Sequence, residues 1–140
     1  MQGFIMKIMV GYNGGEVGEL ALSLARDYAK TNNAFVYILT SLEGGSSEKA
    51  ADITDAEKDL KFAKTLMDDG GVQCEAQQSV RGLSAGEDLV KFAEENEVEH
   101  IFLGIKKRSR VQKALMGSTS RYVILKAPCP VTTITLPDKF

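Results

Sequence analysis

The 140-residue sequence contains few of the residues that build metal sites or disulfide scaffolds. Its two cysteines, Cys74 and Cys129, and its single histidine, His100, form no CxxC motif and no Cys/His cluster. This spacing argues against a structural zinc site, and two cysteines allow at most one bridge. We therefore expect both thiols to be reduced and packed as small apolar residues.

Long hydrophobic runs are also missing. No stretch approaches the roughly 20 apolar residues that span a bilayer. Residues 1–10 contain too short an apolar stretch, and no cleavage site of small residues, for a signal peptide. The sequence therefore predicts a cytoplasmic protein without a membrane segment. Proline is scarce, with three residues, so that turns are expected to depend on the thirteen glycines.

Charge is unevenly distributed along the chain. Residues 1–100 hold 18 acidic and 9 basic residues, a net charge of −9, whereas residues 101–140 hold 8 basic residues and one acidic residue, a net charge of +7. An anionic ligand bound by the last part of the chain is one explanation of this asymmetry.

Hydrophobic periodicity alternates between strand and helix along the whole chain. Short apolar runs predict buried strands at 4–10, 34–39, 98–103 and 131–136, and weaker alternation predicts an edge strand at 72–80. Helices are predicted at 17–28, 48–69, 84–93 and 118–126, the third of them opened by a capping box at Ser84–Glu87. The buried face of the first helix is expected to comprise Val17, Leu20, Ala21, Leu24, Ala25 and Tyr28. The pattern predicts a single α/β domain over residues 1–140, a doubly wound, Rossmann-like, five-stranded parallel sheet with helices on both faces.

Ligands of such sheets bind beyond the carboxyl ends of the strands, where the strand order reverses. One loop expected at that end carries five cations, Lys106, Lys107, Arg108, Arg110 and Lys113. It is followed by Gly117-Ser-Thr-Ser120 at the start of a helix, where free N–H groups and the helix dipole favour an anion. The alternatives are a solvated basic loop and an ordinary serine N-cap. Nucleic acid is not expected, because no aromatic residue is interleaved with the cations and the rest of the chain is acidic.

Three motifs carry a resemblance to a known family. They are Gly104-x2-Lys107-x9-Gly117-Ser118, the sequence Ala127-Pro-Cys-Pro-Val131, and the turn Val10-Gly-Tyr-Asn-Gly-Gly15-Glu16. Together with the order of elements over the whole length, they resemble the universal stress protein family. The resemblance implies the strand order 3-2-1-4-5 and a site for ATP or AMP between the first and fourth strands.

The resemblance also implies which residues would hold the nucleotide. Gly11, Tyr12 and Asn13 would line the nucleoside, Ser41 would lie beside the base, and Leu103 and Gly104 would pass close to the ribose. The phosphates would be surrounded by Lys107, Gly117, Ser118, Thr119 and Ser120. Two positions depart from the family pattern. Asn13 replaces an aspartate and brings no charge for a metal, although Mg²⁺ could accompany ATP, and Lys107 replaces a glycine and offers a point charge to a phosphate.

No arrangement for catalysis is found in the sequence. The Walker A pattern, the nucleophile elbow and a Gly-x-Gly-x-x-Gly turn are absent, and His100 is expected to be structural. We therefore expect a binding protein and not an enzyme, with residual slow hydrolysis of ATP left open.

The last strand is expected at an edge, where Val131, Ile134 and Leu136 would pair with a second copy in a homodimer, as the resemblance also implies. The alternative is an edge that the tail at 137–140 shields. The alternative function is a stress-response interaction protein that works without nucleotide, whose basic loop docks an unknown regulatory partner.

Overall fold

The computed structural model of the chain describes residue 3 and residues 6–42, 50–106 and 117–137. Five strands form one parallel sheet in the order β3-β2-β1-β4-β5. The strands are β1 (Met6–Gly11), β2 (Ala34–Leu42), β3 (Cys74–Val80), β4 (His100–Gly104) and β5 (Val131–Ile134). The predicted fold class and strand order are confirmed. Because the chain builds outward from β1 to β3 and then returns to the other side of β1, the order reverses between β1 and β4.

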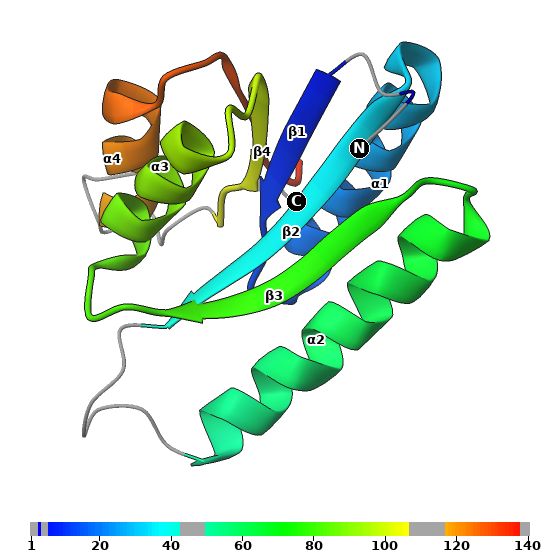
Figure 1. The fold of residues 1–140 in the computed structure, drawn as a ribbon. Helices are drawn as coiled ribbons and strands as arrows, with labels where there is room; N and C mark the ends of the chain where they lie inside the picture. The colour runs from blue at the N-terminus through cyan, green and yellow to red at the C-terminus, as the bar shows by residue number, and fades with distance from the viewer. Residues whose placement is uncertain (1–2, 4–5, 43–49, 107–116, 138–140) are drawn as a thin grey trace.

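Two helices cover each face of the sheet (Figure 1). On one face, α1 (Glu16–Asn32) and α2 (Ala50–Asp69) share a buried core with alternate residues of the central strands, such as Ile8 and Val36. On the other face, α3 (Ala85–Glu95) and α4 (Ser118–Lys126) pack on the residues between them, such as Met9 and Leu103. The strands that are covered on both faces are continuous apolar runs for this reason.

The first helix shows the clearest difference from the predicted pattern. Leu20 and Leu24, which the sequence placed on the buried face, are each 42% exposed. The buried positions of α1 are Gly18, Ala21, Leu22, Ala25 and Ala29. Four of these five side chains are small and follow helical spacing, so that the helix axis can lie close to the sheet. The prediction placed the large side chains of Leu20 and Leu24 on the buried face, whereas close packing on this sheet favours the small residues.

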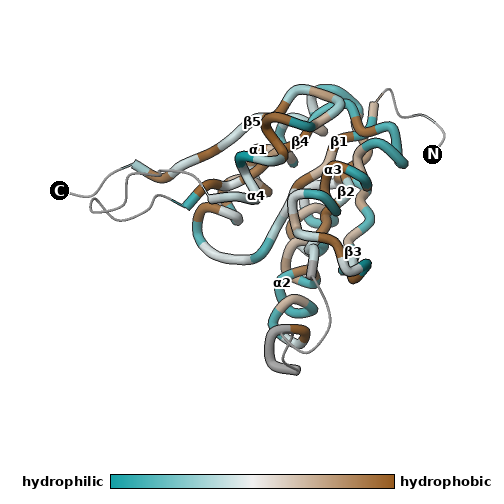
Figure 2. Tube along the Cα trace, turned by 90° about the vertical axis from the view of Figure 1, so that its left-hand side faces the viewer, coloured by the Kyte–Doolittle hydropathy of each residue, from teal (hydrophilic) through white to brown (hydrophobic). Residues whose placement is uncertain are grey.

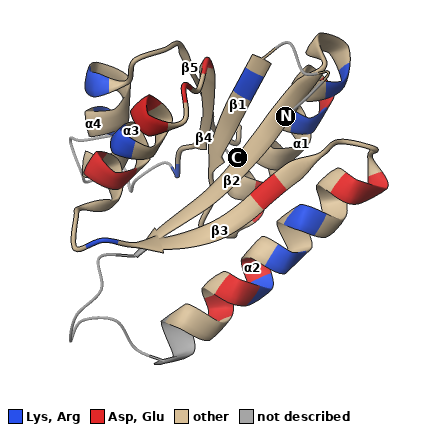
Figure 3. Ribbon diagram, viewed as in Figure 1, with Lys and Arg blue, Asp and Glu red and all other residues tan. Residues whose placement is uncertain are grey.

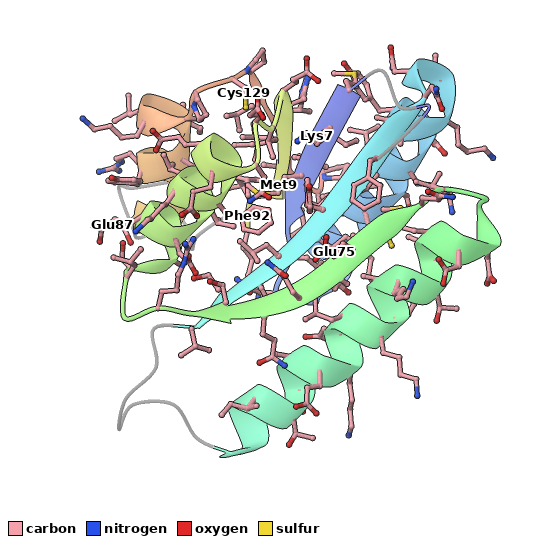
Figure 4. The ribbon with its side chains drawn as sticks, in the orientation of Figure 1. Lys7, Met9, Glu75, Glu87, Phe92 and Cys129 are labelled. Atoms are coloured by element: carbon pink, nitrogen blue, oxygen red, sulfur yellow. The ribbon has the colours of Figure 1, made fainter. Side chains whose placement is uncertain are left out.

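The next two helices show the expected helical features. In α2 a stripe at helical spacing, Ala56, Leu60, Ala63 and Met67, is buried. The capping box of α3 is present, because the Glu87 N–H donates to Ser84 Oγ at 3.3 Å and the Ser84 N–H donates to Glu87 Oε1 at 3.4 Å. Phe92 of α3 lies between this helix and the sheet, and Glu87 lies on its outer side (Figure 4).

Element boundaries differ from the predictions by a few residues. The second strand continues to Leu42, whereas the last strand ends at Ile134 and not at Leu136. The start of the second helix extends beyond the sheet (Figure 2), and the helix carries acidic and basic side chains along its exposed side (Figure 3). One such pair is Lys64 and Asp68, with 3.4 Å between Nζ and Oδ2.

Both cysteines are free and half-buried, as predicted. Cys74 packs against the core under α1 and α2, and Cys129 packs against the core under α3 and α4. The two thiols therefore lie on opposite faces of the sheet and form no disulfide bond with each other. Burial raises the pKa of both thiols, which keeps them protonated and poorly nucleophilic.

Candidate functional site

The carboxyl ends of β1 and β4 lie side by side at the point where the strand order reverses. Gly11, the last residue of β1, is in register with Leu103 of β4. Gly104 then packs against the start of α1, since a Cβ at this position would lie 2.7 Å from the Val17 carbonyl oxygen. Only glycine fits so close to a neighbouring backbone, so Gly104 has a packing role in addition to any contact with a ligand.

Two adjoining hollows open at this point. One has a volume of about 610 Å³ and lies between the start of α1 and the segment that follows β5, with Leu136 and Pro137 in its wall. The other has a volume of about 130 Å³ and lies on the side of α3 and α4. Gly11, Asn13 and Gly104 border both hollows, which are therefore two parts of one crevice.

The smaller hollow brings together most of the predicted site residues, and we call it the switch-point hollow. Eight of the eleven residues line it: Gly11, Tyr12, Asn13, Ser41, Leu103, Gly104, Thr119 and Ser120. Gly117 and Ser118 are described but do not line it, and Lys107 lies outside the described residues. Sequence segments separated by as many as 109 positions, from Gly11 to Ser120, thus meet at one place.

The phosphate-binding prediction is centred on the first turn of α4. Gly117 is the N-cap residue, with extended backbone, and no side chain caps the helix in the part of the chain that is described. Thr119 and Ser120 are half-buried and face the hollow, whereas Ser118 is exposed. The amide groups of this turn and two hydroxyl groups are therefore available to an anion in the hollow.

Tyr12 borders the hollow but its ring belongs to the core under α1. The side chain is 3% exposed, and its ring lies so close to Gly18 that a Cβ there would be 2.9 Å from Cε1. Burial, followed by the charges of Asp59 and Glu19, raises the pKa of Tyr12 to about 12. The Tyr12 carbonyl oxygen accepts a hydrogen bond from Thr40 Oγ1 at 2.6 Å, which fixes the turn after β1 to β2.

The structure adds three apolar or small residues that the site prediction did not include. Leu39, Ala85 and Leu89 line the switch-point hollow together with the predicted residues. The sequence predicts Leu39 in a buried strand and Leu89 in a helix, but it could not show that both face the hollow.

A buried ion pair that the sequence analysis missed lies beside Ser41. Asp88 of α3 is 1% exposed, and Ser41 Oγ donates to its Oδ2 at 2.6 Å. Arg81 donates to Asp88 Oδ1 through Nε at 2.7 Å, and its Nη2 lies 2.6 Å from the same oxygen. The other end of the guanidinium donates through Nη1 to Glu95 Oε1 at 2.8 Å. The network connects β2, the loop after β3, and α3.

The Asp88 carboxyl remains ionised although it is buried. Burial alone would raise its pKa, but hydrogen bonds from Ser41, Ser79 and Arg81, together with the charge of Arg81, outweigh it and leave the pKa below its ordinary value. A pKa lower in the folded than in the unfolded chain stabilises the fold above the unfolded pKa of about 3.9. This contribution is lost as the pH falls through the folded value.

We expect the free energy of unfolding to decrease on acidification below about pH 5, with Asp88 as one of its sources. The variant Asp88→Asn cannot titrate at this position and should show a shallower decrease. Urea unfolding at several pH values between 2 and 7 measures the difference. Equal pH slopes for the wild-type protein and the variant would contradict the assignment.

The remaining polar candidates lie elsewhere. Lys106 is exposed and lines the larger hollow, and the other four cations of the basic loop lie outside the described residues. His100 begins β4, at the opposite end of the strand from the crevice, and its Nε2 is 2.6 Å from Thr132 Oγ1. Its ring stacks on Phe102 with 4.6 Å between centroids, and burial lowers its pKa. These contacts agree with the structural role predicted for His100.

Neither a metal cluster nor a membrane helix is found in the described part of the chain. Within residues 6–42, 50–106 and 117–137, no three His, Cys, Asp or Glu side chains are arranged to hold a metal ion. Over the same residues, none of the helices is both long and apolar enough to cross a membrane.

Comparison with known proteins gives matches over nearly the whole chain. Residues 5–135 match the model of the universal stress protein family. A universal stress protein from Mycolicibacterium smegmatis is 27% identical over 135 residues, which are 91% of this chain and 95% of that protein.

Solved structures with the same fold come from Archaeoglobus fulgidus. A universal stress protein of this organism is 34% identical, with a TM-score of 0.83 and 94% of each chain covered. A structure of the universal stress protein from the same organism in complex with dAMP is 31% identical, with a TM-score of 0.78, and covers 94% of this chain and 98% of that one.

Proposed function

This chain belongs to the universal stress protein family, and on that basis we propose that it binds an adenine nucleotide in the switch-point hollow. The observation that carries the proposal is the convergence of Thr119 and Ser120 with Gly11, Asn13 and Gly104 around one hollow at the reversal of strand order. The dAMP complex of the relative from Archaeoglobus fulgidus supports an adenine nucleotide as the ligand.

The proposed nucleotide has its phosphate at the start of α4. The uncapped amides of this turn and the hydroxyls of Thr119 and Ser120 offer several donors to one anion, and the helix dipole favours negative charge there. Basic residues of the loop before Gly117 would add counter-charge, as the sequence predicts.

The proposed base lies at the other end of the hollow. Leu39 and Leu89 give an apolar lining there, and Ser41 supplies a hydroxyl group beside them. Binding sites for small molecules commonly combine a mostly apolar lining with a few placed polar groups. The ribose would then cross the ends of β1 and β4 near Asn13 and Gly104, which both border the hollow.

We propose that the protein acts as a regulatory binding module of the stress response and not as a catalyst. The described lining of the switch-point hollow includes no Asp, Glu, His or Lys, and the pKa of Tyr12 is raised to about 12. No group with a pKa near neutrality is therefore placed there to act as a general base. Asn13 likewise brings no charge for Mg²⁺ at the turn where the family pattern has an aspartate.

Identification of the bound molecule tests the proposal. Purified protein is denatured and the supernatant is chromatographed for nucleotides, and nucleotide-free protein is then melted with AMP or ATP, each with and without magnesium. We expect an adenine nucleotide in the supernatant and a higher melting temperature with ligand. Protein that releases no nucleotide and does not respond at millimolar ligand would instead favour the interaction protein that works without nucleotide.

We also propose that the protein is a homodimer paired through β5. This strand is at the edge of the sheet, and β4 is its only neighbour among the described strands. Leu125 of α4 is 72% exposed, and Leu20 and Leu24 of α1, a helix that contacts β5, are 42% exposed. A second copy would cover the edge and these side chains together with the predicted Val131, Ile134 and Leu136.

We expect the mass in solution to be twice the chain mass of 15.2 kDa and to fall to that of one chain in the variant Thr133→Lys. Thr133 is an exposed residue of β5, and a lysine on an edge strand opposes pairing with another strand. The matched control is Thr65→Lys on the exposed side of α2. Light scattering after size exclusion measures all three masses, and a monomeric wild-type protein would exclude the dimer.

A further inference from the structure

The hydroxyl group of Ser41 is held in one orientation by a buried charge. Its oxygen lies 2.6 Å from Asp88 Oδ2, and the Asp88 carboxylate is 1% exposed and fixed from its other side by Arg81. Distances of this kind are typical of strong hydrogen bonds to an ionised acceptor. A serine at the rim of a ligand hollow would otherwise be free to rotate its proton towards the ligand.

The direction of this hydrogen bond follows from the charge state of Asp88. The pKa of the Asp88 carboxyl is below its ordinary value in the fold, so the group is ionised near neutral pH. An ionised carboxylate has no proton and accepts only. Ser41 must therefore donate to it, and the oxygen of Ser41 has only lone pairs left to offer to the hollow.

Ser41 lies at the end of the hollow where the base is expected. Leu39 and Ser41 are two positions apart in β2, so their side chains point to the same face of the sheet, the one covered by α3. β2 is two strands away from β4, about 10 Å at the usual strand spacing. The proposed phosphate site is at the start of α4, which follows β4 in the chain. Because β1 lies between β2 and β4, Ser41 and the phosphate site are on opposite sides of β1.

We propose that Ser41, oriented by Asp88, selects purines with a 6-amino group over purines with a 6-oxo group. The inference rests on the proposed function and adds to it a residue that determines base specificity. Adenine carries an amino donor at position 6, which the lone pairs of Ser41 accept. Hypoxanthine and guanine carry an oxygen there, and two acceptors without a proton between them repel each other.

The expected preference is at least about tenfold in the dissociation constant, because a buried polar group left without its partner is costly. Asp88 and Arg81 do not touch the base in this account. They are positioning residues that act through Ser41, and their effect should appear in the ratio of two affinities and not only in stability.

The test is calorimetric titration of nucleotide-free protein with AMP, IMP and purine riboside 5′-phosphate, which lacks a 6-substituent. The wild-type protein should bind AMP most tightly, the unsubstituted purine less tightly, and IMP least tightly. Ser41→Ala should weaken the binding of AMP and make the affinities for the three nucleotides similar. In Asp88→Asn, the new amide can donate to Ser41 Oγ and release the hydroxyl proton to the hollow, so that the ratio of AMP to IMP affinity should fall.

Glu95→Gln is the matched control, because it changes only the exposed end of the same network. It should leave the ratio unchanged. Equal affinities of the wild-type protein for AMP and IMP, or a ratio that Ser41→Ala does not alter, would overturn the inference and leave the proposed function standing. Absence of binding by all three nucleotides would overturn the proposed function and the inference with it. If Asp88→Asn does not fold, Ser41→Ala alone decides.

Discussion

Replacement of Ser120 by aspartate is expected to weaken AMP binding by about a hundredfold or more, because two like charges placed together cost several kcal/mol and each 1.4 kcal/mol is a factor of ten. Ser120 is the third residue of α4 and lines the hollow where the phosphate is proposed to bind. The same charge is favourable to the helix itself, because an acidic side chain in the first turn interacts well with the dipole. The variant therefore separates ligand binding from folding.

Calorimetric titration with AMP and urea unfolding of the ligand-free protein measure the two effects. The affinity should fall, while the free energy of unfolding should stay equal or rise slightly. Thr65→Asp, an exposed position on α2 across the sheet, adds the same charge without approaching the hollow. It should leave the affinity unchanged. Unaltered AMP binding by Ser120→Asp would show that the phosphate does not bind at the start of α4.

Removal of the Asp88 carboxylate by Asp88→Ala is expected to lower the free energy of unfolding by about 3–5 kcal/mol, the usual cost of breaking a buried ion pair from one side. The side chain is 1% exposed, and the substitution leaves Arg81 and Ser41 without their shared acceptor. A loss of this size is a large part of the 5–15 kcal/mol that stabilises typical domains.

The exposed partner of Arg81 gives the internal comparison. The Glu95 side chain is 49% exposed, so Glu95→Ala should cost less than about 1 kcal/mol, as exposed ion pairs do. Urea unfolding of the wild-type protein and both variants measures the two losses. Similar losses for Asp88→Ala and Glu95→Ala would mean that burial does not distinguish these two carboxylates.

Local patterns in the sequence were sufficient to predict most of the fold. The strands buried on both faces are continuous apolar runs, and the capping box at Ser84 needs only residues three positions apart. The buried face of α1 was predicted wrongly in part, because hydrophobic periodicity gives large apolar side chains more weight than small ones. Leu20 and Leu24 gave the stronger hydrophobic signal, but Ala21, Ala25 and Ala29 allow closer packing on the sheet.

The candidate site was predictable where it depends on loops and less so where it depends on packing. The glycines at the ends of β1 and β4 and the hydroxyls at the start of α4 stand out as motifs, and the structure places several of them around one hollow. The pair formed by Ser41 and Asp88 is 47 positions apart and gives no local signal. Only the parallel alignment of β2 with β1 and the packing of α3 on both bring these two side chains together.

A crystal structure of the protein with AMP tests the central claim most directly. We predict the phosphate at the backbone amides of Thr119 and Ser120, the ribose across the ends of β1 and β4, and the base against Leu39 and Leu89 with its amino group at Ser41. AMP bound instead between the start of α1 and the segment after β5, or a complex in which the side chains of Leu89 and Leu103 close the switch-point hollow, would contradict the account.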